Sequence, residues 1–444
     1  MRPSSILALT LLAGSLAGAC GGAAPPARAN LVLILADDLG AGDVGWTGLA
    51  TEPIPTPNLD RLVRSGVALD QFRSAPLCTP ARAAFLTGMA PARLGLLRNI
   101  SQRDAGGLSP EAPTLAEVLR AAGYATGLVG KWHLGHAAGS LRPNARGFER
   151  FHGVRGGWID HETHARGTTR DWWRDEEPLV ETGHDTRLLA SAAARAIEER
   201  DRARPFYLQL AFTTPHAPTA VPAGRSLAES AAAGDATRRA YALLVDELDR
   251  GVGLVLDALE REGLREHTLV VFASDNGAPL AYGGSNGVLR GAKGSVYDGA
   301  LRVPALLSWP GRLAPGRSAL AMQATDLAPT VCQALSVPFP AASPRDGVSL
   351  WDALADGEAP PERVAVFGVE RADGTSWAAF DGRWKLVDER GGPAPALYDL
   401  RADPSEERDL AAAEPGVRAR LEAALVPWRA LPHLPFEPDE GPRR

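Results

Sequence analysis

Residues 30–36, with the sequence NLVLILA, constrain the fold more than any other segment of the chain. All of them except Asn30 are apolar, so a strand built from them would be buried on both faces. Strands of this kind occur almost only in parallel sheets that helices cover on both sides. Helical patterns at 57–66, 114–123, 185–200 and 236–262 alternate with strand-like runs at 124–129, 206–212 and 268–273. This alternation predicts an α/β fold with a large mixed, mostly parallel sheet flanked by helices.

The pattern changes after about residue 340. Short strand-like runs at 364–367, 376–380, 384–387 and 396–400 are separated by turn residues, and one helical pattern follows at 415–431. Short strands with turns between them are typical of an antiparallel sheet. We therefore predict a main domain of residues 30–340 and a C-terminal subdomain of residues 341–444, built from a small antiparallel sheet and one helix.

The N-terminus has the features of an export signal. Arg2 precedes an apolar run at 6–16, and the small residues Ala17-Gly18-Ala19 come just before Cys20. The apolar run is too short to span a bilayer, and it predicts a secretory signal peptide of residues 1–19 followed by a tether at 20–29. Two interpretations remain open, ordinary cleavage with Cys20 incidental, or a bacterial lipobox with Cys20 lipidated. We favour a lipid-anchored protein of the bacterial periplasm or cell envelope.

Charge and cysteine content exclude several classes of protein. The chain has 444 residues and a formal net charge of −6, from 53 acidic and 47 basic residues, so we expect no nucleic-acid partner. Its three cysteines are too few for a disulfide framework. Cys332 falls in the apolar helical run 327–335, where a buried structural cysteine is the ordinary outcome. Cys78 does not fit that description, because Pro80 and Arg82 surround it.

Oxygen-bearing side chains follow two of the predicted strands. Asp37 and Asp38 come directly after the first strand, and Asp275 and Asn276 follow the run 268–273. Each pair alone could be a solvated turn, or an Asx-type turn. Because ligands of α/β sheets bind at the carboxyl ends of the strands, we expect the two pairs to meet. Together they predict a site for a hard cation, Ca²⁺ or Mg²⁺.

Basic and imidazole side chains follow the other strands. Lys131 and His133 are two residues apart, so in extended chain they face the same side, where they suit an anionic substrate and a proton transfer. His216 lies between Pro215 and Pro218, and Lys293 has small neighbours that allow close approach to an anion. A packed histidine and solvated loops are the alternatives.

Cys78, Pro80 and Arg82 form the most specific motif of the chain. Pro80 suits the first turn of a helix. Cys78 would then lie at the helix N-terminus, where free N–H groups and the helix dipole favour anions. Arg82, one turn further on, can reach the same space.

The segment Cys78-Thr79-Pro80-Ala81-Arg82 resembles the C-x-P-x-R signature of type I sulfatases, which belong to the alkaline phosphatase superfamily. Residues 123–135, from GYAT to GKWHLG, resemble the second signature of that family, and further matches follow in order along the chain at Asp37-Asp38, His216, Asp275-Asn276 and Lys293. The resemblance implies an alkaline-phosphatase-like α/β sandwich. It also implies an arylsulfatase-like activity that releases inorganic sulfate from sulfated carbohydrates, including oligosaccharides, or from aryl sulfates.

The resemblance implies that Cys78 is oxidised to formylglycine by a formylglycine-generating enzyme, a partner needed for maturation. The hydrated aldehyde has two hydroxyl groups, of which one attacks sulfur and the other loses a proton when sulfate leaves. By the same resemblance, Ca²⁺, with Mg²⁺ as the second candidate, would be held by Asp37, Asp38, Asp275, Asn276 and the modified Cys78.

The other matching residues receive roles toward the sulfate group. Arg82, Lys131 and Lys293 would neutralise it, with Lys131, His216 and Lys293 in contact with substrate. His133 would be the base that releases sulfate, and His216, with Lys293, would protonate the leaving alcohol.

The residues leave two alternatives to a sulfatase open. One is a phosphoester or phosphonate monoester hydrolase of the same superfamily, and the other is a non-catalytic surface protein that binds sulfated ligands. A cysteine-thiolate phosphatase is excluded. The active-site loop of that class needs more residues between its cysteine and its arginine than the three that separate Cys78 from Arg82.

Overall fold

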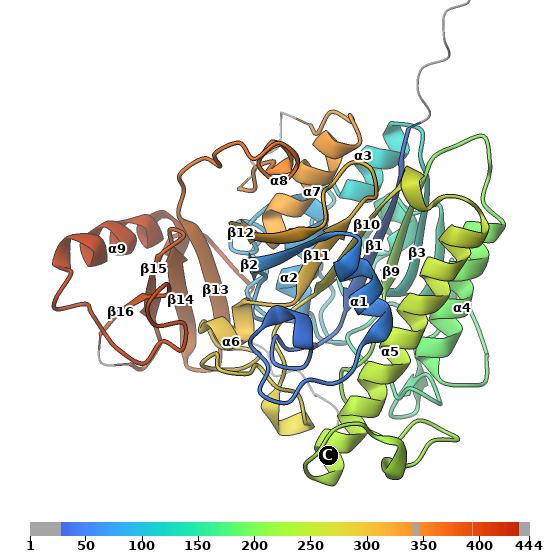
Figure 1. The fold of residues 1–444 in the computed structure, drawn as a ribbon, viewed down its shortest axis with the longest axis horizontal. Helices are drawn as coiled ribbons and strands as arrows, with labels where there is room; N and C mark the ends of the chain where they lie inside the picture. The colour runs from blue at the N-terminus through green and yellow to red at the C-terminus, as the bar shows by residue number, and fades with distance from the viewer. Residues whose placement is uncertain (1–27, 341–345, 393, 435–444) are drawn as a thin grey trace, which may run out of the picture.

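A ten-stranded mixed sheet forms the centre of the molecule in the computed structural model, which describes residues 28–340, 346–392 and 394–434. The strand order is β12-β2-β11-β10-β1-β9-β3-β4-β7-β8 (Figure 1). The strands are β1 (Asn30–Ala36), β2 (Val67–Arg73), β3 (Ala125–Lys131), β4 (Arg150–Val154), β7 (Trp173–Arg174), β8 (Glu177–Pro178), β9 (Phe206–Ala211), β10 (Thr268–Ser274), β11 (Ala305–Ser308) and β12 (Gly316–Gln323). The five central strands β10, β1, β9, β3 and β4 run parallel to one another, and β11, β7 and β8 are antiparallel to their neighbours.

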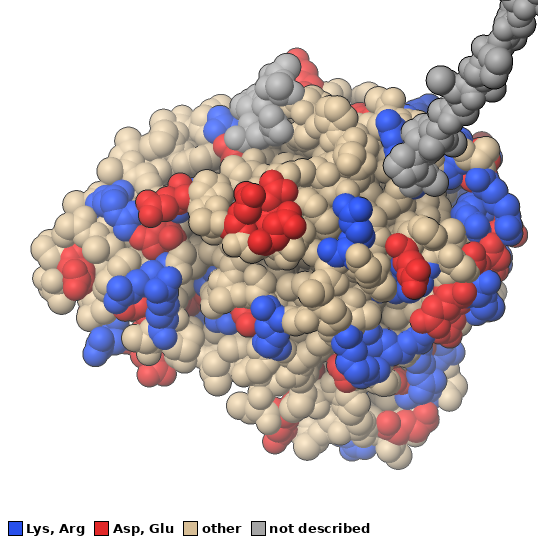
Figure 2. Space-filling view, turned by 45° about the horizontal axis from the view of Figure 1, so that its top comes forward, with Lys and Arg blue, Asp and Glu red and all other residues tan. Residues whose placement is uncertain are grey.

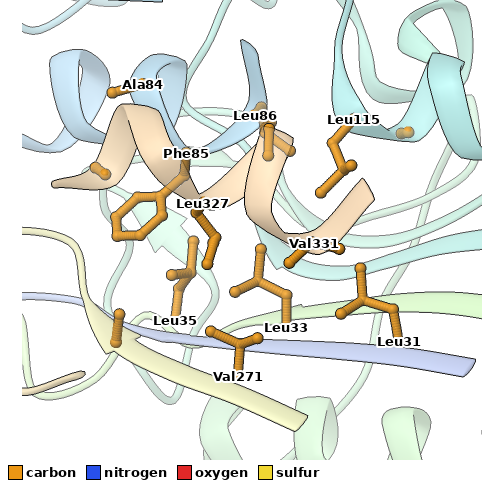
Figure 3. Packing of buried hydrophobic residues seen from close by; sticks show 14 of the residues in the cluster. Leu31, Leu33, Leu35, Ala84, Phe85, Leu86, Leu115, Val271, Leu327 and Val331 are labelled. Carbon is orange, nitrogen blue, oxygen red and sulfur yellow. The ribbon is translucent and has the colours of Figure 1, made fainter. Parts of the chain in front are cut away.

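Helices cover both faces of this sheet, as predicted. On β1, Leu31, Leu33 and Leu35 pack toward one helical layer, while Val32 and Ile34 pack toward the other. The first layer contains α2 (Cys78–Thr87), α3 (Leu115–Ala121), α7 (Ala324–Ala334) and α8 (Trp351–Ala355), and Figure 3 shows the three leucines beneath its side chains. The second layer contains α1 (Pro57–Arg64), α4 (Asp185–Glu198) and α5 (Ala236–Arg261). Burial on both faces explains why the sequence of β1 is continuously apolar.

Local sequence signals account for several helix boundaries. At the start of α3, the backbone N–H of Glu117 donates to Thr114 Oγ1 at 3.1 Å, and the N–H of Thr114 donates to Glu117 Oε2 at 2.8 Å. Together these two bonds form a capping box, for which Thr114 and Glu117 have the required three-residue spacing. Pro57 occupies the first turn of α1. Such caps satisfy backbone groups that the helix itself leaves without partners.

A second, four-stranded antiparallel sheet follows the main sheet in sequence. It consists of β13 (Ala365–Arg371), β14 (Gly374–Phe380), β15 (Trp384–Asp388) and β16 (Ala396–Asp399), with α9 (Pro415–Arg429) packed on it (Figure 1). The short helix α6 (Asp298–Leu301) joins its core to the main body. The fold class predicted from the sequence is therefore confirmed.

Four buried charged side chains connect the two sheets. Asp298 accepts from Arg73 of β2 at 2.6 Å and from Lys385 of β15 at 2.8 Å. Lys385 also lies 2.8 Å from a carboxylate oxygen of Glu406. We call these residues the Lys385 cluster.

The remaining elements are short. A two-stranded sheet pairs β5 (Ala165–Arg166) with β6 (Thr169–Arg170). Single turns of 3-10 helix lie at η1 (Gly45–Thr47), η2 (Gly139–Leu141), η3 (Pro143–Arg146), η4 (Leu227–Glu229), η5 (Arg265–His267) and η6 (Leu280–Tyr282).

Acidic and basic side chains are interspersed on the face of the molecule shown in Figure 2. Within the described ranges, no helix has both the length and the hydrophobicity needed to cross a bilayer. The predicted signal peptide and Cys20 lie outside the described residues.

Candidate active site

The carboxyl ends of β1 and β10 bring together the two pairs of oxygen-bearing side chains. The strands are paired in parallel with Ala36 opposite Ser274, so the residues that follow each of them leave the sheet side by side. The backbone N–H of Asp275 donates to the Ala36 carbonyl at 3.0 Å, and that of Asp38 donates to Asp275 Oδ1 at 3.2 Å. Asp38 has a φ of +71°, which turns the chain out of the strand. Asp37, Asp38, Asp275 and Asn276 are all buried together at this edge.

Three cationic side chains neutralise the three carboxylates. Lys131 Nζ lies 2.6 Å from Asp37, Arg82 Nη2 lies 2.9 Å from Asp275, and Lys293 Nζ lies 2.7 Å from Asp38. Arg82 also donates to the carbonyl oxygen of Lys131 at 3.0 Å. Burial of unpaired charges at this density would be prohibitive, so the pairing is what permits the cluster to form.

Cys78 is the first residue of α2, with Leu77 as the N-cap, as its position before Pro80 predicts. Its Sγ donates to Asp37 Oδ1 at 3.5 Å. One atom each from Asp37, Asp38, Cys78 and His216 lie within 4.8 Å of one another. Burial raises the pKa of the Cys78 thiol well above its usual value, despite the nearby lysines. The unmodified side chain is therefore a poor thiolate nucleophile at neutral pH.

The cluster of Asp37, Asp38, Asp275 and Asn276 has the chemistry of a hard-cation site. Asn276 donates to Asp38 Oδ1 at 2.6 Å, but Asn276 Oδ1 is buried and has no hydrogen-bond partner among the described residues. Burial and the neighbouring Asp37 raise the pKa of Asp275 to about 6. An unsatisfied buried acceptor beside carboxylates that repel each other fits a bound Ca²⁺ or Mg²⁺. The residues that would hold it are Asp37, Asp38, Asp275 and Asn276.

His133 lies just beyond β3, with one ring nitrogen free. Its Nε2 lies 3.0 Å from the carbonyl oxygen of Ile100, which can only accept, so Nε2 carries the proton of the neutral ring. Its Nδ1 is buried and has no hydrogen-bond partner in the described part of the chain. Burial and the charges of Lys131 and Arg82 lower the pKa of His133 well below its ordinary value. The ring is thus neutral, with a free lone pair.

Lys131 and His133 were expected to face the same side of an extended chain, but the extended conformation ends before His133. Strand β3 runs through Lys131, but His133 has a φ of +57°, so the chain has already left the extended conformation. The ring is oriented by its bond to Ile100 instead of by the strand.

His216 follows β9 and lies on the Asp38 side of the site. Its Nε2 is 3.7 Å from Asp38 Oδ2, and its Nδ1 lies 2.6 Å from the Ala217 carbonyl, which fixes the Nδ1 proton. Burial and Lys293 lower the pKa of His216 to about 4. An anion bound next to the ring would raise the pKa of His216. Nε2 is therefore the nitrogen free to exchange a proton.

Thr79 is a site residue that the residue-type argument did not single out. Its hydroxyl donates to the His133 carbonyl at 2.9 Å and accepts from the N–H of Ile100 at 3.1 Å. It therefore connects α2, which begins at Cys78, to the backbone of His133 and to that of Ile100, whose carbonyl orients the His133 ring. Its place inside the Cys78–Arg82 motif was the only signal in the sequence.

The Sulfatase family model matches residues 29–337, which include every one of these site residues. This chain belongs to the sulfatase family. It is a sulfuric ester hydrolase, and two mammalian relatives agree. Mouse steryl-sulfatase is 34% identical, over 97% of this chain and 87% of its own length, and human arylsulfatase A is 33% identical, over 94% and 89%.

A solved structure has the same fold as this sulfatase. It is Ps i-CgsB in complex with k-i-k-neocarrahexaose, which superimposes with a TM-score of 0.86 and 28% identity, over 92% of this chain and 95% of its own. The fold of this sulfatase is therefore shared along almost its whole described length.

Proposed function

We propose that this sulfatase hydrolyses sulfate esters of carbohydrates, or aryl sulfates, with formylglycine at position 78 and a bound Ca²⁺. One observation carries the proposal: buried Cys78 contacts Asp37 among three carboxylates and three cations, beside an unsatisfied Asn276 oxygen. A divalent cation there would stabilise negative charge on the sulfate oxygens. Mg²⁺ is the second candidate for the same ligands.

The raised pKa of the Cys78 thiol supports conversion to formylglycine, since a protonated thiol is a weak nucleophile. The hydrate of formylglycine would supply one hydroxyl to attack sulfur and a second whose deprotonation releases sulfate. Lys131, Lys293 and Arg82 would offset the charge of the sulfate group. Each of these cations forms an ion pair with a carboxylate of the site, which supports this role.

Two histidines would handle the protons. His133, with a free Nδ1 and a neutral ring, is suited to take the proton of the second hydroxyl. His216, with Nε2 facing Asp38 and Nδ1 fixed, is suited to protonate the leaving alcohol. General acid–base catalysis of this kind contributes roughly 10²–10⁴-fold in rate.

The carbohydrate part of the proposal rests on similarity. The Ps i-CgsB structure is a complex with a neocarrahexaose, an oligosaccharide. We extend that substrate class to this sulfatase as a proposal, together with aryl sulfates, which the similarity to human arylsulfatase A supports.

The activity test compares Cys78→Ala with Cys332→Ala, a matched control at the other described buried cysteine. We expect Cys78→Ala to lower kcat on 4-nitrophenyl sulfate by several orders of magnitude, and Cys332→Ala to leave it nearly unchanged. Faster turnover of 4-nitrophenyl phosphate than of the sulfate would favour the phosphoester or phosphonate hydrolase. Full biological effect of Cys78→Ala would favour the non-catalytic binder.

We also propose that the protein is exported as a lipoprotein, with a signal at 1–19, a tether at 20–29, a catalytic domain at 30–340 and a subdomain at 341–444. The end of the family match at residue 337 supports the last boundary. A Cys20→Ser variant should move from the membrane fraction to the soluble fraction, and unchanged fractionation would contradict lipidation.

A further inference from the structure

A second group of buried titratable side chains lies beside the active site. His161, His184 and Asp185 are all less than a twentieth exposed, with His161 at 4%, His184 at 2% and Asp185 at 0%. Asp185 is the first residue of α4, and the rings of His161 and His184 are stacked with centroids 5.1 Å apart. We call these three residues the His161 cluster. None of them enters the mechanism described above.

The neighbours of His161 determine its charge. Its Nδ1 lies 3.0 Å and 3.1 Å from the two Asp185 oxygens, and its Nε2 lies 3.0 Å from the carbonyl oxygen of His216. A carbonyl only accepts, and Asp185 already accepts from the Thr213 hydroxyl at 2.5 Å and the Thr186 N–H at 2.6 Å, as an ionised carboxylate does. Both nitrogens of His161 must therefore donate, which makes the ring an imidazolium.

The electrostatics agree with this assignment. Burial alone would lower the pKa of His161, but the Asp185 carboxylate outweighs burial and raises the pKa above its ordinary value. Asp185 itself has a pKa well below its usual range, because His161 and the Thr213 hydroxyl outweigh its burial.

The cluster anchors the segment that carries His216. Asp185 accepts from Thr213, the Thr186 hydroxyl lies 3.1 Å from that of Thr214, and His161 donates to the His216 carbonyl. Two contacts from α4 and one from the turn before β5 thus hold the segment after β9 at Thr213, Thr214 and His216. The bond from His161 is the one that reaches the backbone of His216 itself.

We propose that His161, held as an imidazolium by Asp185, is a positioning residue that keeps His216 Nε2 directed at the leaving-group oxygen of the substrate. The inference rests on the proposed function, in which His216 is the general acid. His161 acts through the backbone of His216 and does not itself touch substrate. Its loss should therefore impair protonation of the leaving group more than attack at sulfur.

A metal ion is not needed to explain the cluster. Both nitrogens of His161 already face acceptors, and Asp185 already accepts hydrogen bonds from three residues. Stoichiometric zinc in the purified enzyme that is lost in His184→Phe would overturn the proposal, because the rings would then be ligands.

The test uses two variants at position 161 and one control. His161→Phe removes both donors at similar size, and His161→Gln keeps one N–H able to reach the His216 carbonyl. His184→Phe is the matched control, because this neighbouring ring is equally buried but makes no bond to His216. Each is assayed for kcat on 4-nitrophenyl sulfate and on phenyl sulfate, whose leaving group is far more basic, and melting temperatures report folding.

We expect His161→Phe to lose about tenfold or more additional kcat on phenyl sulfate relative to 4-nitrophenyl sulfate, within the range for general acids. His161→Gln should recover most of that selective loss, and His184→Phe should show none. Equal losses of His161→Phe on both substrates, or no recovery in His161→Gln, would overturn the proposal.

The His216→Ala enzyme separates failure of this inference from failure of the proposed function. If His216→Ala shows the selective loss and His161→Phe does not, only the positioning role is wrong. If His216→Ala loses both substrates equally, the acid role itself is wrong and the inference falls with it. Nitrogen NMR of the wild-type enzyme measures the protonation state of the His161 ring directly and does not depend on whether the variants fold. A neutral His161 ring at pH 7 would also overturn the proposal.

Discussion

Among the single residues of the site, Asn276 separates cation binding from the ion pairs around it. Removing Asp275 would take from the buried guanidinium of Arg82 its nearest carboxylate, so the effects of that change on folding and on cation binding would be mixed. Asn276 carries no charge, and its Oδ1 has no hydrogen bond to lose within the described structure, so Asn276→Ala breaks no ion pair and removes only the bonds that Nδ2 donates to Asp38 and to the Gly277 carbonyl.

We therefore predict that Asn276→Ala weakens Ca²⁺ binding about 10–100-fold, the range seen when groups supporting a metal site are removed. The measurement is calorimetric titration of chelator-treated protein with Ca²⁺. Asn144→Ala is the control, because Asn144 Oδ1 also lacks a described partner, while its Nδ2 donates to Asp175, which is not a carboxylate of the site. Equal Ca²⁺ affinity in wild type and Asn276→Ala would rule out the assigned ligand.

His161 also gives a prediction for stability against pH. Its pKa in the folded protein is raised above the value of 6.5 expected for the unfolded chain. Its contribution is therefore fully present below about pH 6.5 and is lost as the pH rises through the folded-state pKa. The charged or titratable groups that face it, Asp185, Asp160, His184 and His216, remain in a His161→Gln variant.

The free energy of unfolding of wild type minus that of His161→Gln should thus decrease between about pH 6 and pH 9, as measured by urea denaturation. A difference that stays constant or grows over this range would mean that His161 is not charged in the folded state.

At the residue scale, the sequence was informative where chemistry depends on residue type and strand ends. Asp37, Asp38, Asp275 and Asn276 could be predicted to meet, because the carboxyl ends of parallel strands share one edge. The orientation of His133 and the link from His161 to His216 could not, because both depend on backbone carbonyls distant in sequence.

At the scale of elements, two glycines allow β3 and β4 to pair closely beside the site. Gly130 and Gly153 are opposite each other in the parallel register, with φ values of +115° and +149°. A Cβ on Gly130 would overlap the carbonyl of Ala211 on β9. Gly130 directly precedes Lys131, so a displaced backbone here also moves a cation of the site.

We predict that Gly130→Ala destabilises the fold by about 1–3 kcal/mol or more, the usual cost of overpacking, and lowers activity as well. Gly127→Ala on the same strand is the control, because its nearest neighbour is Leu208 Cδ1 at 3.7 Å, an ordinary contact. Urea denaturation measures both, and similar stability of the two variants would show that the close approach is not required.

Elements were predictable in proportion to how local their signals are. The apolar strands β1, β9 and β10 and the capped helix α3 follow from short stretches of sequence. The outer strands β2 and β12, with sequences VALDQFR and GRSALAMQ, mix polar and apolar residues without a regular alternation and were not predicted. Their pairing comes from contact with β11 and with each other, which the local pattern does not contain.

For the whole molecule, the Lys385 cluster is the polar part of the junction between the two sheets. Lys385 is completely buried and lies between the carboxylates of Asp298 and Glu406. The small sheet was predictable from its short strands, but this junction was not, because charged residues are usually expected at the surface.

We predict that Lys385→Met destabilises the protein by about 3–5 kcal/mol, since two buried carboxylates lose their shared cation. Arg429→Gln is the control, because it removes an exposed cation of α9 whose partner, Asp388 of β15, is also open to solvent, and ion pairs of this kind contribute little to stability. Both are read from urea denaturation. A Lys385→Met protein as stable as Arg429→Gln would show that the small sheet is held by its apolar core alone.

The chemical identity of the side chain at position 78 tests the central claim most directly. Enzyme produced with a formylglycine-generating enzyme is digested, and the peptide containing Cys78 is weighed by mass spectrometry alongside the rate of sulfate release. The account predicts an aldehyde at this position in a proportion that matches the specific activity across preparations. A fully active preparation in which Cys78 keeps its thiol would contradict it.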